Sequence, residues 1–203
     1  MSGKRQWMAQ HVSDPYVKKA RKEGFRSRAV YKLMEIDEKD RIVRPGSTVI
    51  DLGAAPGGWS QWVSKRLQGK GRVIALDCLP MEPLPDVTFI QGDFLEDQTL
   101  EVLLNTLGDE KAGLVISDMA PNMSGVKAVD IPRVLELAEL AMDLSVKVLA
   151  KRGVLLMKIF QGAGTDVLIK QLRTRFSRVV IRKPKASRPK SRECYVLSQG
   201  FLG

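Results

Sequence analysis

Residues 48–60, TVIDLGAAPGGWS, constrain the fold of this chain more than any other stretch. An apolar run rich in β-branched residues ends at Asp51. Three glycines, Gly53, Gly57 and Gly58, follow before the helical pattern WSQWVSKRL begins. This order predicts a strand, a tight turn and a helix, as at the start of a βαβ unit. Glycines let the backbone pass close to a ligand, and a helix N-terminus offers unpaired N–H groups, so the turn is a candidate nucleotide-type site.

A glycine-rich turn is by itself a weak functional signal, because structural turns of this kind are common. The dinucleotide fingerprint G-x-G-x-x-G is absent, since Gly53 and Gly57 are four positions apart with Pro56 between them. The pattern therefore argues against a nicotinamide-dependent dehydrogenase and leaves the ligand open.

Beyond Pro45-Gly46, strand-like apolar runs alternate with helical patterns. The predicted strands are 48–53, 72–77, 87–91, 113–119, 154–160, 178–183 and 194–199. The predicted helices are 58–67, 97–107, 131–149 and 163–176. This alternation predicts an α/β fold with a seven-stranded, mostly parallel sheet and helices on both faces. The last two strands have no helix between them, which predicts an antiparallel pair at the sheet edge.

Residues 1–45 are expected to form a basic N-terminal helical segment that packs on a core domain of residues 46–203. A helix is predicted through SRAVYKLMEIDEKD, where apolar residues from Val30 to Ile36 recur on one face. The sequence contains no internal repeat, and no low-complexity linker lies between the two parts. We therefore expect a single globular unit.

Charge is distributed unevenly along the 203 residues, whose formal net charge is +10. Basic residues outnumber acidic ones 12 to 6 in residues 1–45 and 9 to 1 in residues 173–203. Residues 46–172 instead hold 12 basic and 16 acidic residues. Basic ends indicate a polyanionic partner, with two solvated basic tails as the alternative. Arginines interleaved with aromatic residues favour nucleic acid, because arginine suits phosphates and aromatic rings suit bases.

Composition excludes several classes of protein. His11 is the only histidine, so a histidine-based triad or a multi-histidine metal site cannot form. Cys78 and Cys194 have no partner at metal-ligand spacing, and reduced structural thiols are expected. The chain has neither an apolar stretch of membrane-spanning length nor the apolar centre of a signal peptide. We expect a cytoplasmic protein without membrane contact, and a monomer because no coiled-coil pattern is present.

Three carboxylates follow predicted strand ends. Asp77 closes the second strand, and Asp93 and Asp118 follow the third and fourth. The carboxyl ends of parallel strands share one edge, so these side chains should gather beside the glycine turn, with Asp77 placed to accept hydrogen bonds from ribose hydroxyls. One such aspartate is commonly a helix cap or turn residue, but three beside a glycine turn favour a ligand site.

Lys158 lies inside the apolar strand VLLMKIF, where a lysine needs a partner. It could be a snorkelling side chain at a strand end. Alternatively, it points into the site beside Asp118. There, burial and nearby positive charge would favour the neutral amine that a general base requires, while the carboxylate would oppose this and hold the side chain in place. Lys32 and Glu193 could complete a charged cluster, although spacing alone does not single them out.

Six blocks of the sequence resemble the signature motifs of the FtsJ family of S-adenosylmethionine-dependent RNA ribose 2′-O-methyltransferases. They are SRAVYKLMEID, DLGAAPGGWSQ, SDMAPNMSG, VDIPR, MKIFQG and KPKASRPKSRECY. The resemblance covers nearly the whole chain and implies a Rossmann-like class I methyltransferase fold. It places the family's catalytic tetrad at Lys32, Asp118, Lys158 and Glu193. It places the positions that bind the cofactor S-adenosyl-L-methionine at Gly57, Trp59, Asp77, Asp93 and Asp118.

The resemblance further implies methyl transfer to the ribose 2′-hydroxyl of a uridine in large-subunit rRNA, on the assembled 50S subunit and without a metal. Lys158 is then the hypothetical proton acceptor. Trp59 packs either on the cofactor or on the neighbouring helix, and the basic block 183–192 either grips phosphates or is a free tail. Two other functions stay open: 2′-O-methylation of tRNA or another RNA, and a non-catalytic RNA-binding role in ribosome assembly.

Overall fold

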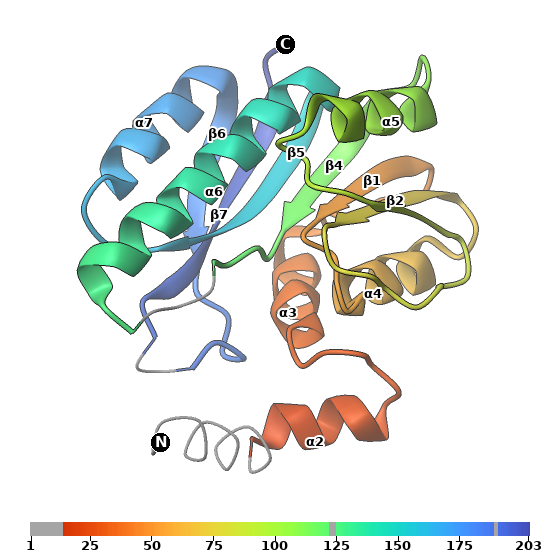
Figure 1. Cartoon of the computed structure of the whole chain (residues 1–203), viewed down its shortest axis with the longest axis horizontal. Helices are drawn as coiled ribbons and strands as arrows, with labels where there is room; N and C mark the ends of the chain where they lie inside the picture. Colours follow the sequence, from red (N-terminus) through yellow and green to blue (C-terminus); the bar gives the residue numbers. More distant parts are fainter. Residues whose placement is uncertain (1–13, 122–124, 189–190) are drawn as a thin grey trace.

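The computed structural model of this chain describes residues 14–121, 125–188 and 191–203 (Figure 1). The strands are β1 (Ser47–Leu52), β2 (Gly71–Asp77), β3 (Val87–Gln91), β4 (Ala112–Ser117), β5 (Leu149–Phe160), β6 (Phe176–Arg182) and β7 (Glu193–Phe201). The helices are α2 (Pro15–Lys22), α3 (Val30–Asp40), α4 (Gly58–Leu67), α5 (Asp97–Leu107), α6 (Lys127–Val148) and α7 (Thr165–Arg175). Residues 1–13 of the predicted basic N-terminal segment lie outside the described residues, as do parts of the blocks SDMAPNMSG and KPKASRPKSRECY.

The described strands form one sheet in the order β3-β2-β1-β4-β5-β7-β6. β1 pairs in parallel with β2 and β4, and parallel pairs also join β2 to β3 and β4 to β5. β7 runs antiparallel to both β5 and β6. The predicted seven-stranded, mostly parallel sheet with an antiparallel pair at one edge is confirmed. The reversed strand is β7, which lies one place in from that edge.

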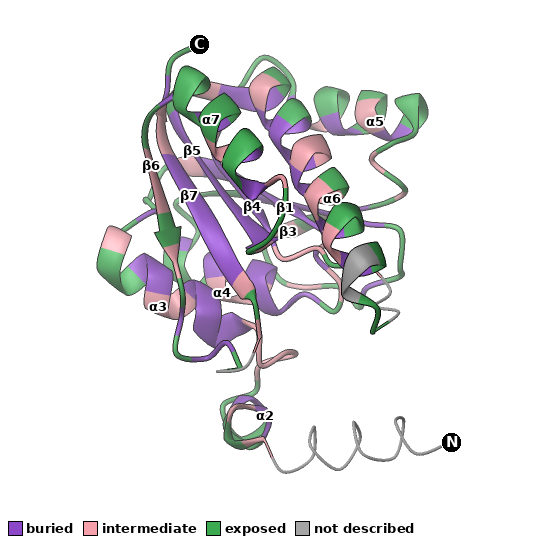
Figure 2. Cartoon of the chain, turned by 90° about the vertical axis from the view of Figure 1, so that its left-hand side faces the viewer, coloured by how far each residue is buried: buried purple, intermediate pink, exposed green. Residues whose placement is uncertain are grey.

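Helices cover both faces of the sheet, because successive side chains of a strand point to opposite faces. On one face, α5, α6 and α7 pack on a core that includes Ile50 and Val115. On the other face, α3 and α4 pack on a core that includes Val49, Leu114 and Ile116. Figure 2 shows the central strands as buried and the outer surface of α7 as largely exposed. Within the described ranges, no helix combines the length and apolar character needed to cross a membrane.

Among the described residues, α2 and α3 precede the sheet, and α3 packs against it. α3 contributes Leu33 and Ile36 to the second core, and Trp59 Nε1 of α4 donates to the oxygen of Ala29 at 2.8 Å, just before α3 begins. α2 contributes Ala20 to a smaller apolar cluster. Figure 1 shows α2 farther from the sheet than α3. The described part of the basic N-terminal segment therefore contacts the sheet mainly through α3.

Two elements begin at least four residues earlier than the sequence predicts, whereas the other early starts differ by one or two residues. α6 begins at Lys127 rather than at residue 131, so Pro132 lies inside the helix, where it removes a backbone donor. β5 begins at Leu149 rather than at residue 154, and its early residues pair with β4 across a register shift. Arg152, in this irregular part, has a φ of 67°. Polar residues interrupt the apolar pattern there, so hydrophobic periodicity carries no signal for the first part of the strand.

Candidate active site

Four charged side chains from distant parts of the sequence meet at the carboxyl edge of the parallel strands. Lys158 Nζ lies 2.8 Å from Asp118 Oδ1, and Lys32 Nζ lies 3.8 Å from the same oxygen. Lys32 Nζ also pairs with Glu193 Oε1 at 2.7 Å. The exposed fraction of these side chains runs from 7% at Lys158 to 19% at Asp118. The structure thus brings together all four residues predicted as catalytic, and we call them the charged cluster.

Each member of the charged cluster comes from a different element. Lys32 lies near the start of α3, Asp118 follows β4, Lys158 lies near the end of β5, and Glu193 begins β7. β5 and β7 pair antiparallel, with Lys158 opposite Tyr195. An antiparallel strand begins where its neighbour ends, so this pairing carries the start of β7 to the edge where β4 and β5 finish.

Lys158 stands in an apolar stretch of β5 and is almost fully buried. Its Nζ donates to the backbone oxygen of Asp118 at 2.5 Å and to Oδ1 at 2.8 Å. Two oxygens of one residue therefore offset the cost of burying the ammonium group. The side chain ends at Asp118 rather than in solvent, as the second of the two interpretations of the sequence predicts.

The Asp118 carboxylate is the centre of the cluster, because Tyr195 also donates its hydroxyl hydrogen to Oδ1, at 2.5 Å. Burial alone would raise the pKa of Asp118, but the Lys158 and Lys32 ammonium groups and the hydrogen bonds from Lys158 and Tyr195 hold that pKa below its ordinary value. Burial, reinforced by the negative charges of Asp118 and Glu193, raises the pKa of Tyr195 well above its ordinary value. Tyr195 is not among the predicted site residues, and only its place opposite Lys158 identifies it.

The loop between β6 and β7, which carries the described part of the basic block, holds Glu193. Ser187 Oγ donates to Glu193 Oε1 at 2.8 Å. Lys183 Nζ donates to the backbone oxygens of Glu193 and, at 2.6 Å, of Ser191. Ser187 is buried, so its hydroxyl is an internal part of the site. The described part of this basic loop therefore folds back on the charged cluster and is not a free tail.

The turn between β1 and α4 requires glycine at two positions. Gly53 has a φ of +71° and Gly57 a φ of +100°, in a region that other residues rarely adopt. A Cβ on Gly53 would overlap Met119 Cγ, and a Cβ on Gly57 would lie 2.8 Å from Met81 Sδ. Gly57 also caps α4, so the turn brings the unpaired N–H groups of that helix to the edge of the sheet.

Asp77, at the end of β2, joins the two loops beside it. Its Oδ2 accepts from the N–H of Ala55 at 2.8 Å, and its Oδ1 accepts from the N–H of Leu79 at 2.8 Å. An ionised carboxylate has about four acceptor sites, so two of these remain for other donors. Asp77 can thus shape the glycine turn and still accept hydrogen bonds from ribose hydroxyls.

A cavity of about 70 Å³ lies under the glycine turn and reaches the charged cluster. Its lining includes Asp51, Gly53, Gly58, Trp59 and Asp118. The chemistry of these groups suits S-adenosylmethionine, because carboxylates suit both ribose hydroxyls and a positive sulfonium, and a glycine turn lets the backbone approach a ligand. The volume is below the range of ligand pockets, about 300–1,000 Å³, so the cavity can enclose only part of such a cofactor. Among the charged cluster, Asp118 alone lines this cavity.

Two of the predicted cofactor residues have contacts that the sequence left undecided. Trp59 is buried, its Nε1 donates to the oxygen of Ala29, and its ring centroid lies 5.7 Å from that of Tyr195. The indole therefore packs between α3 and β7 and also lines the cavity. Asp93 is exposed, and its Oδ1 accepts from the N–H of Leu95 at 3.0 Å, a turn-forming contact. Asp93 does not belong to the lining of that cavity.

Asp51 is a buried carboxylate that the sequence did not single out for the site. It is 1% exposed, and its Oδ2 accepts from Ser60 Oγ at 2.7 Å. Burial raises the pKa of Asp51 to about 7, with the Ser60 hydrogen bond opposing the shift and the charges of Asp118 and Asp77 adding to it. The signal was present in the sequence, because Asp51, like Lys158, is a charged residue at the end of an apolar strand.

The two cysteines lie outside the charged cluster. Cys78 is exposed and Cys194 is buried, and both are free thiols. Burial raises the pKa of the Cys194 thiol to about 11, so it stays protonated at neutral pH. Among the described residues, no group of three or more histidine, cysteine, aspartate or glutamate side chains is arranged to hold a metal ion.

Comparison with known proteins identifies close relatives. Residues 25–201 match the family model of FtsJ-like methyltransferases. The chain is 55% identical over 197 residues to ribosomal RNA large subunit methyltransferase E of Legionella pneumophila (strain Corby), covering 97% of this chain and 96% of that one. It is 57% identical over 197 residues to the protein of the same name from Pseudomonas fluorescens, covering 97% and 94% of the two chains.

Solved structures show the same architecture. A ribosomal RNA methyltransferase from Plasmodium falciparum superposes with a TM-score of 0.82 at 32% identity, covering 88% of this chain and 100% of that one. Human methyltransferase-like protein 13 in complex with SAH gives a TM-score of 0.62 at 12% identity, covering 85% and 82%. The second similarity concerns the fold alone, and both agree with a Rossmann-like methyltransferase sheet.

Proposed function

The chain belongs to the FtsJ-like methyltransferase family, and on this premise we propose that it transfers a methyl group from S-adenosylmethionine to the ribose 2′-hydroxyl of a uridine in large-subunit ribosomal RNA. The observation that carries the proposal is the contact of two ammonium groups with two carboxylates beside a glycine turn. The names of the relatives support large-subunit RNA as the substrate. We extend the proposal to the assembled subunit as the form in which this RNA is modified.

S-adenosylmethionine supplies a methyl group that is already activated by a positive sulfonium. The residues proposed to hold this cofactor surround the carboxyl ends of β1 to β4. Gly57 gives the backbone of the turn access to it, Asp77 accepts from its ribose hydroxyls, and Asp118 balances its positive charge. Trp59 lines the cavity beside the glycine turn. Asp93 follows β3 and lies outside the lining of that cavity.

Lys158 is proposed to accept the proton of the 2′-hydroxyl at Nζ. A general base has to come within hydrogen-bond distance of the hydroxyl, and Lys158 Nζ is held in the charged cluster, 2.8 Å from Asp118 Oδ1. The accepting form is the neutral amine. Asp118 also pairs with Lys32 and accepts from the hydroxyl of Tyr195, so Lys158 is one of three groups that contact this carboxylate.

Lys32 and Glu193 are proposed to position the substrate hydroxyl. Glu193 holds Lys32 at 2.7 Å, and Lys32 also faces Asp118, so the two acids fix both amines in one place. Fixed alignment of reacting groups contributes on the order of 7–11 kcal/mol in favourable cases.

RNA is proposed to approach over the loop between β6 and β7, whose Lys183 and Ser187 contact Glu193. Basic side chains in this loop would neutralise phosphates near the site of methyl transfer. All members of the charged cluster come from one chain, which supports the proposal that a single copy acts, in the cytoplasm where its substrate is made.

Transfer of labelled methyl groups tests the proposed function. Large subunits from cells lacking this protein are incubated with the enzyme and methyl-labelled S-adenosylmethionine, and the label is mapped by RNA digestion. We expect label on the 2′-oxygen of a uridine in large-subunit RNA, and less label on extracted RNA than on intact subunits. Label confined to tRNA or to a base, or RNA binding without methyl transfer, contradicts the proposal.

A further inference from the structure

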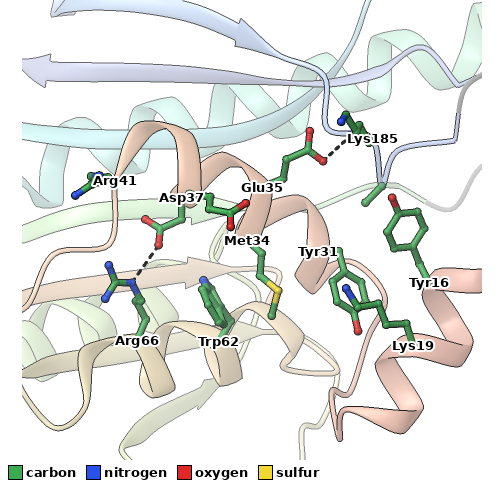
Figure 3. A pocket seen from close by; sticks show the side chains of 12 residues that line it. Tyr16, Lys19, Tyr31, Met34, Glu35, Asp37, Arg41, Trp62, Arg66 and Lys185 are labelled. Carbon is green, nitrogen blue, oxygen red and sulfur yellow. Dashed lines mark hydrogen bonds and ion pairs between the residues drawn. The ribbon is translucent and has the colours of Figure 1, made fainter.

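A second cavity, of about 680 Å³, lies among α2, α3 and α4 (Figure 3). This volume falls within the range of ligand pockets, about 300–1,000 Å³. Figure 3 shows Tyr16 of α2, Tyr31 and Met34 of α3 and Trp62 of α4 around it. None of the residues that line it belongs to the charged cluster or to the glycine turn. The proposed methyl transfer therefore leaves this cavity without a role.

Aromatic and apolar side chains form the floor of this cavity. The ring centroids of Tyr16 and Tyr31 lie 5.5 Å apart. Tyr31 is buried, whereas Tyr16, Met34 and Trp62 are half-buried and keep part of their surface open. Trp62 Nε1 is buried, and among the described residues it has no hydrogen-bond partner. The open surface of the half-buried rings is therefore what this cavity offers to a ligand.

Exposed cations form the rim of the cavity. They are Lys19, Arg41, Arg66 and Lys185. Lys19 Nζ lies 4.5 Å from the centroid of the Tyr31 ring, so this charge is held at the edge of the aromatic floor. Positive groups around half-buried rings form the combination with which proteins bind single-stranded nucleic acid, through phosphates and stacked bases.

Three acidic side chains, Glu35, Asp37 and Glu38, also line the cavity, and Asp37 pairs with one of the rim cations. Asp37 accepts from the N–H of Val43 at 2.8 Å and pairs with Arg66 at 3.5 Å. Glu35 accepts from the N–H of Lys185 at 2.7 Å. Figure 3 shows both carboxylates turned toward these partners. Pairing with Asp37 occupies Arg66, so the rim cations without an acidic partner among the described residues at the cavity are Lys19, Arg41 and Lys185.

We propose that this cavity binds an unpaired nucleotide of the RNA substrate, with its base on Tyr16 and Trp62 and its phosphates at the basic rim. The inference rests on the proposed function, since it names a contact of the same RNA. A base stacks on an aromatic ring whatever its sequence, because every base has a π face.

Two elements connect the cavity to the charged cluster. α3 places Tyr31 at the cavity and Lys32 in the cluster. The loop between β6 and β7 places Lys185 at the cavity and Ser187 against Glu193. The bound nucleotide is therefore one that flanks the methylated residue and fixes the register of the RNA, because the methylated ribose itself has to reach Lys158.

Photo-crosslinking tests the site directly. Large-subunit RNA containing 4-thiouridine, from cells lacking this protein, is bound to the full chain and irradiated, and the crosslinked peptides are identified. We expect crosslinks in the peptides that carry α2 or α4, which hold Tyr16 and Trp62. Crosslinks confined to other segments overturn the proposal, as does a crosslink from these peptides to a ribosomal protein in place of RNA when intact subunits are used.

Kinetics of matched variants test the contribution of the site. Tyr16→Leu removes the ring and keeps an apolar side chain, and the double variant Lys19→Gln/Lys185→Gln removes two rim charges. The control Lys170→Gln/Arg173→Gln removes two exposed charges from α7. Because loss of one base stack corresponds to about ten-fold in affinity, we expect the KM for RNA to rise about ten-fold in the cavity variants only. We expect kcat at saturating RNA and the Kd for S-adenosylmethionine to be unchanged.

An unchanged KM for RNA in both cavity variants overturns the inference, and so does an equal rise in the control. If Tyr16→Leu lowers the unfolding temperature, the double variant Lys19→Gln/Lys185→Gln decides, because both side chains are exposed. An unchanged KM in that variant then overturns the inference. If the wild-type protein crosslinks through these peptides but transfers no methyl group, the nucleotide site is supported and the proposed function is contradicted. The two proposals can thus fail separately.

Discussion

Tyr195 donates its hydroxyl hydrogen to Asp118 Oδ1 at 2.5 Å, the same oxygen that accepts from Lys158 Nζ at 2.8 Å. Tyr195 and Lys158 face each other across the antiparallel pair of β7 and β5. Because burial keeps the pKa of Tyr195 high, its hydroxyl remains a donor throughout the neutral range. This hydrogen bond fixes the carboxylate that in turn holds Lys158.

Tyr195→Phe is expected to lower the free energy of unfolding by about 1.5–3 kcal/mol, because it removes a hydrogen bond to a charged group and keeps the ring packed on Trp59. Urea unfolding measures the loss. The matched control is Tyr31→Phe, whose hydroxyl donates to Glu23, a residue with 42% of its side chain exposed. Solvent can replace that partner, so the control should lose less. Equal losses would show that the Asp118 contact adds no stability.

Lys158→Ala is expected to reduce the rate of methyl transfer about 10²–10⁴-fold, the usual effect of removing a general base. Cofactor and RNA affinities should remain close to those of the wild type, since Lys32 still balances Asp118. Single-turnover methylation and separate binding titrations measure these quantities. Lys170→Ala, on the exposed side of α7, is the control. Full turnover in Lys158→Ala would mean that another group, or water, accepts the proton.

Asp51 should make stability depend on pH near neutrality. Its pKa rises from 3.8 to about 7 on folding, mainly through burial. Between these values the folded protein keeps a proton that the unfolded chain releases, so the stabilisation is complete below the lower value and lost as pH rises through the higher one. Asp51→Asn removes this loss. The variant should gain stability relative to wild type from pH 5 to 8, by roughly 3 kcal/mol.

Urea unfolding at several pH values measures this difference between the wild type and Asp51→Asn. Asparagine keeps an oxygen that can accept from Ser60 Oγ, so the hydrogen bond is retained in the variant. Parallel stability profiles for the two proteins would contradict a raised pKa at Asp51.

Comparing Gly53→Ala with Gly24→Ala separates two costs of adding a Cβ: the strain of a left-handed backbone and the steric overlap with a neighbouring side chain. Both glycines have a φ of +71°, but a Cβ at Gly24 meets no atom within 4 Å, whereas one at Gly53 overlaps Met119. Gly24→Ala should cost about 1–2 kcal/mol of stability through its left-handed backbone. Gly53→Ala should cost about 1–3 kcal/mol more and weaken S-adenosylmethionine binding, because Met119 or the turn has to move. Thermal unfolding and calorimetry measure both, and equal effects would remove the steric argument.

Arg26 braces the glycine turn from outside, so its replacement should affect the cofactor. Its guanidinium donates to the oxygens of Pro56 at 3.3 Å, Glu82 at 2.6 Å and Pro83 at 2.8 Å. A lysine cannot make these contacts together, because it lacks the planar fork. Arg26→Lys should lower S-adenosylmethionine affinity by about ten-fold, equivalent to ~1.4 kcal/mol. Calorimetry measures it, with Arg21→Lys on α2 as control, and identical affinities would exclude the brace.

Local sequence signals predicted the elements of the sheet region well. α4 and α5 have the predicted bounds, 58–67 and 97–107, because amphipathic periodicity and the residues that end a helix act over a few positions. α2 was not predicted, although Asp14-Pro15 is a helix start signal and the Asp14 side chain accepts from the N–H of Tyr16 at 2.9 Å. A helix of 8 residues with many charges gives little periodicity to detect.

Physical reasoning from the sequence predicted only some residues of the candidate site. Asp118 and Lys158 stood out by physical reasoning, because one follows a strand end and the other is a lysine within an apolar strand. Lys32 and Glu193 came from the family resemblance alone. The contacts of Tyr195 with Asp118 depend on how β7 pairs with β5, and no local pattern encodes that pairing.

The sequence by itself determined the glycine turn, the alternation of strands and helices and the gathering of strand-end aspartates at one edge, because these depend on neighbouring residues and on the common direction of parallel strands. The tertiary structure decided which amines reach that edge. Lys32 arrives there because α3 packs on the sheet, and Glu193 arrives because β7 reverses direction beside β5. Both depend on long-range packing, in which the burial of apolar surface selects one arrangement of distant segments, so no stretch of the chain read alone contains them.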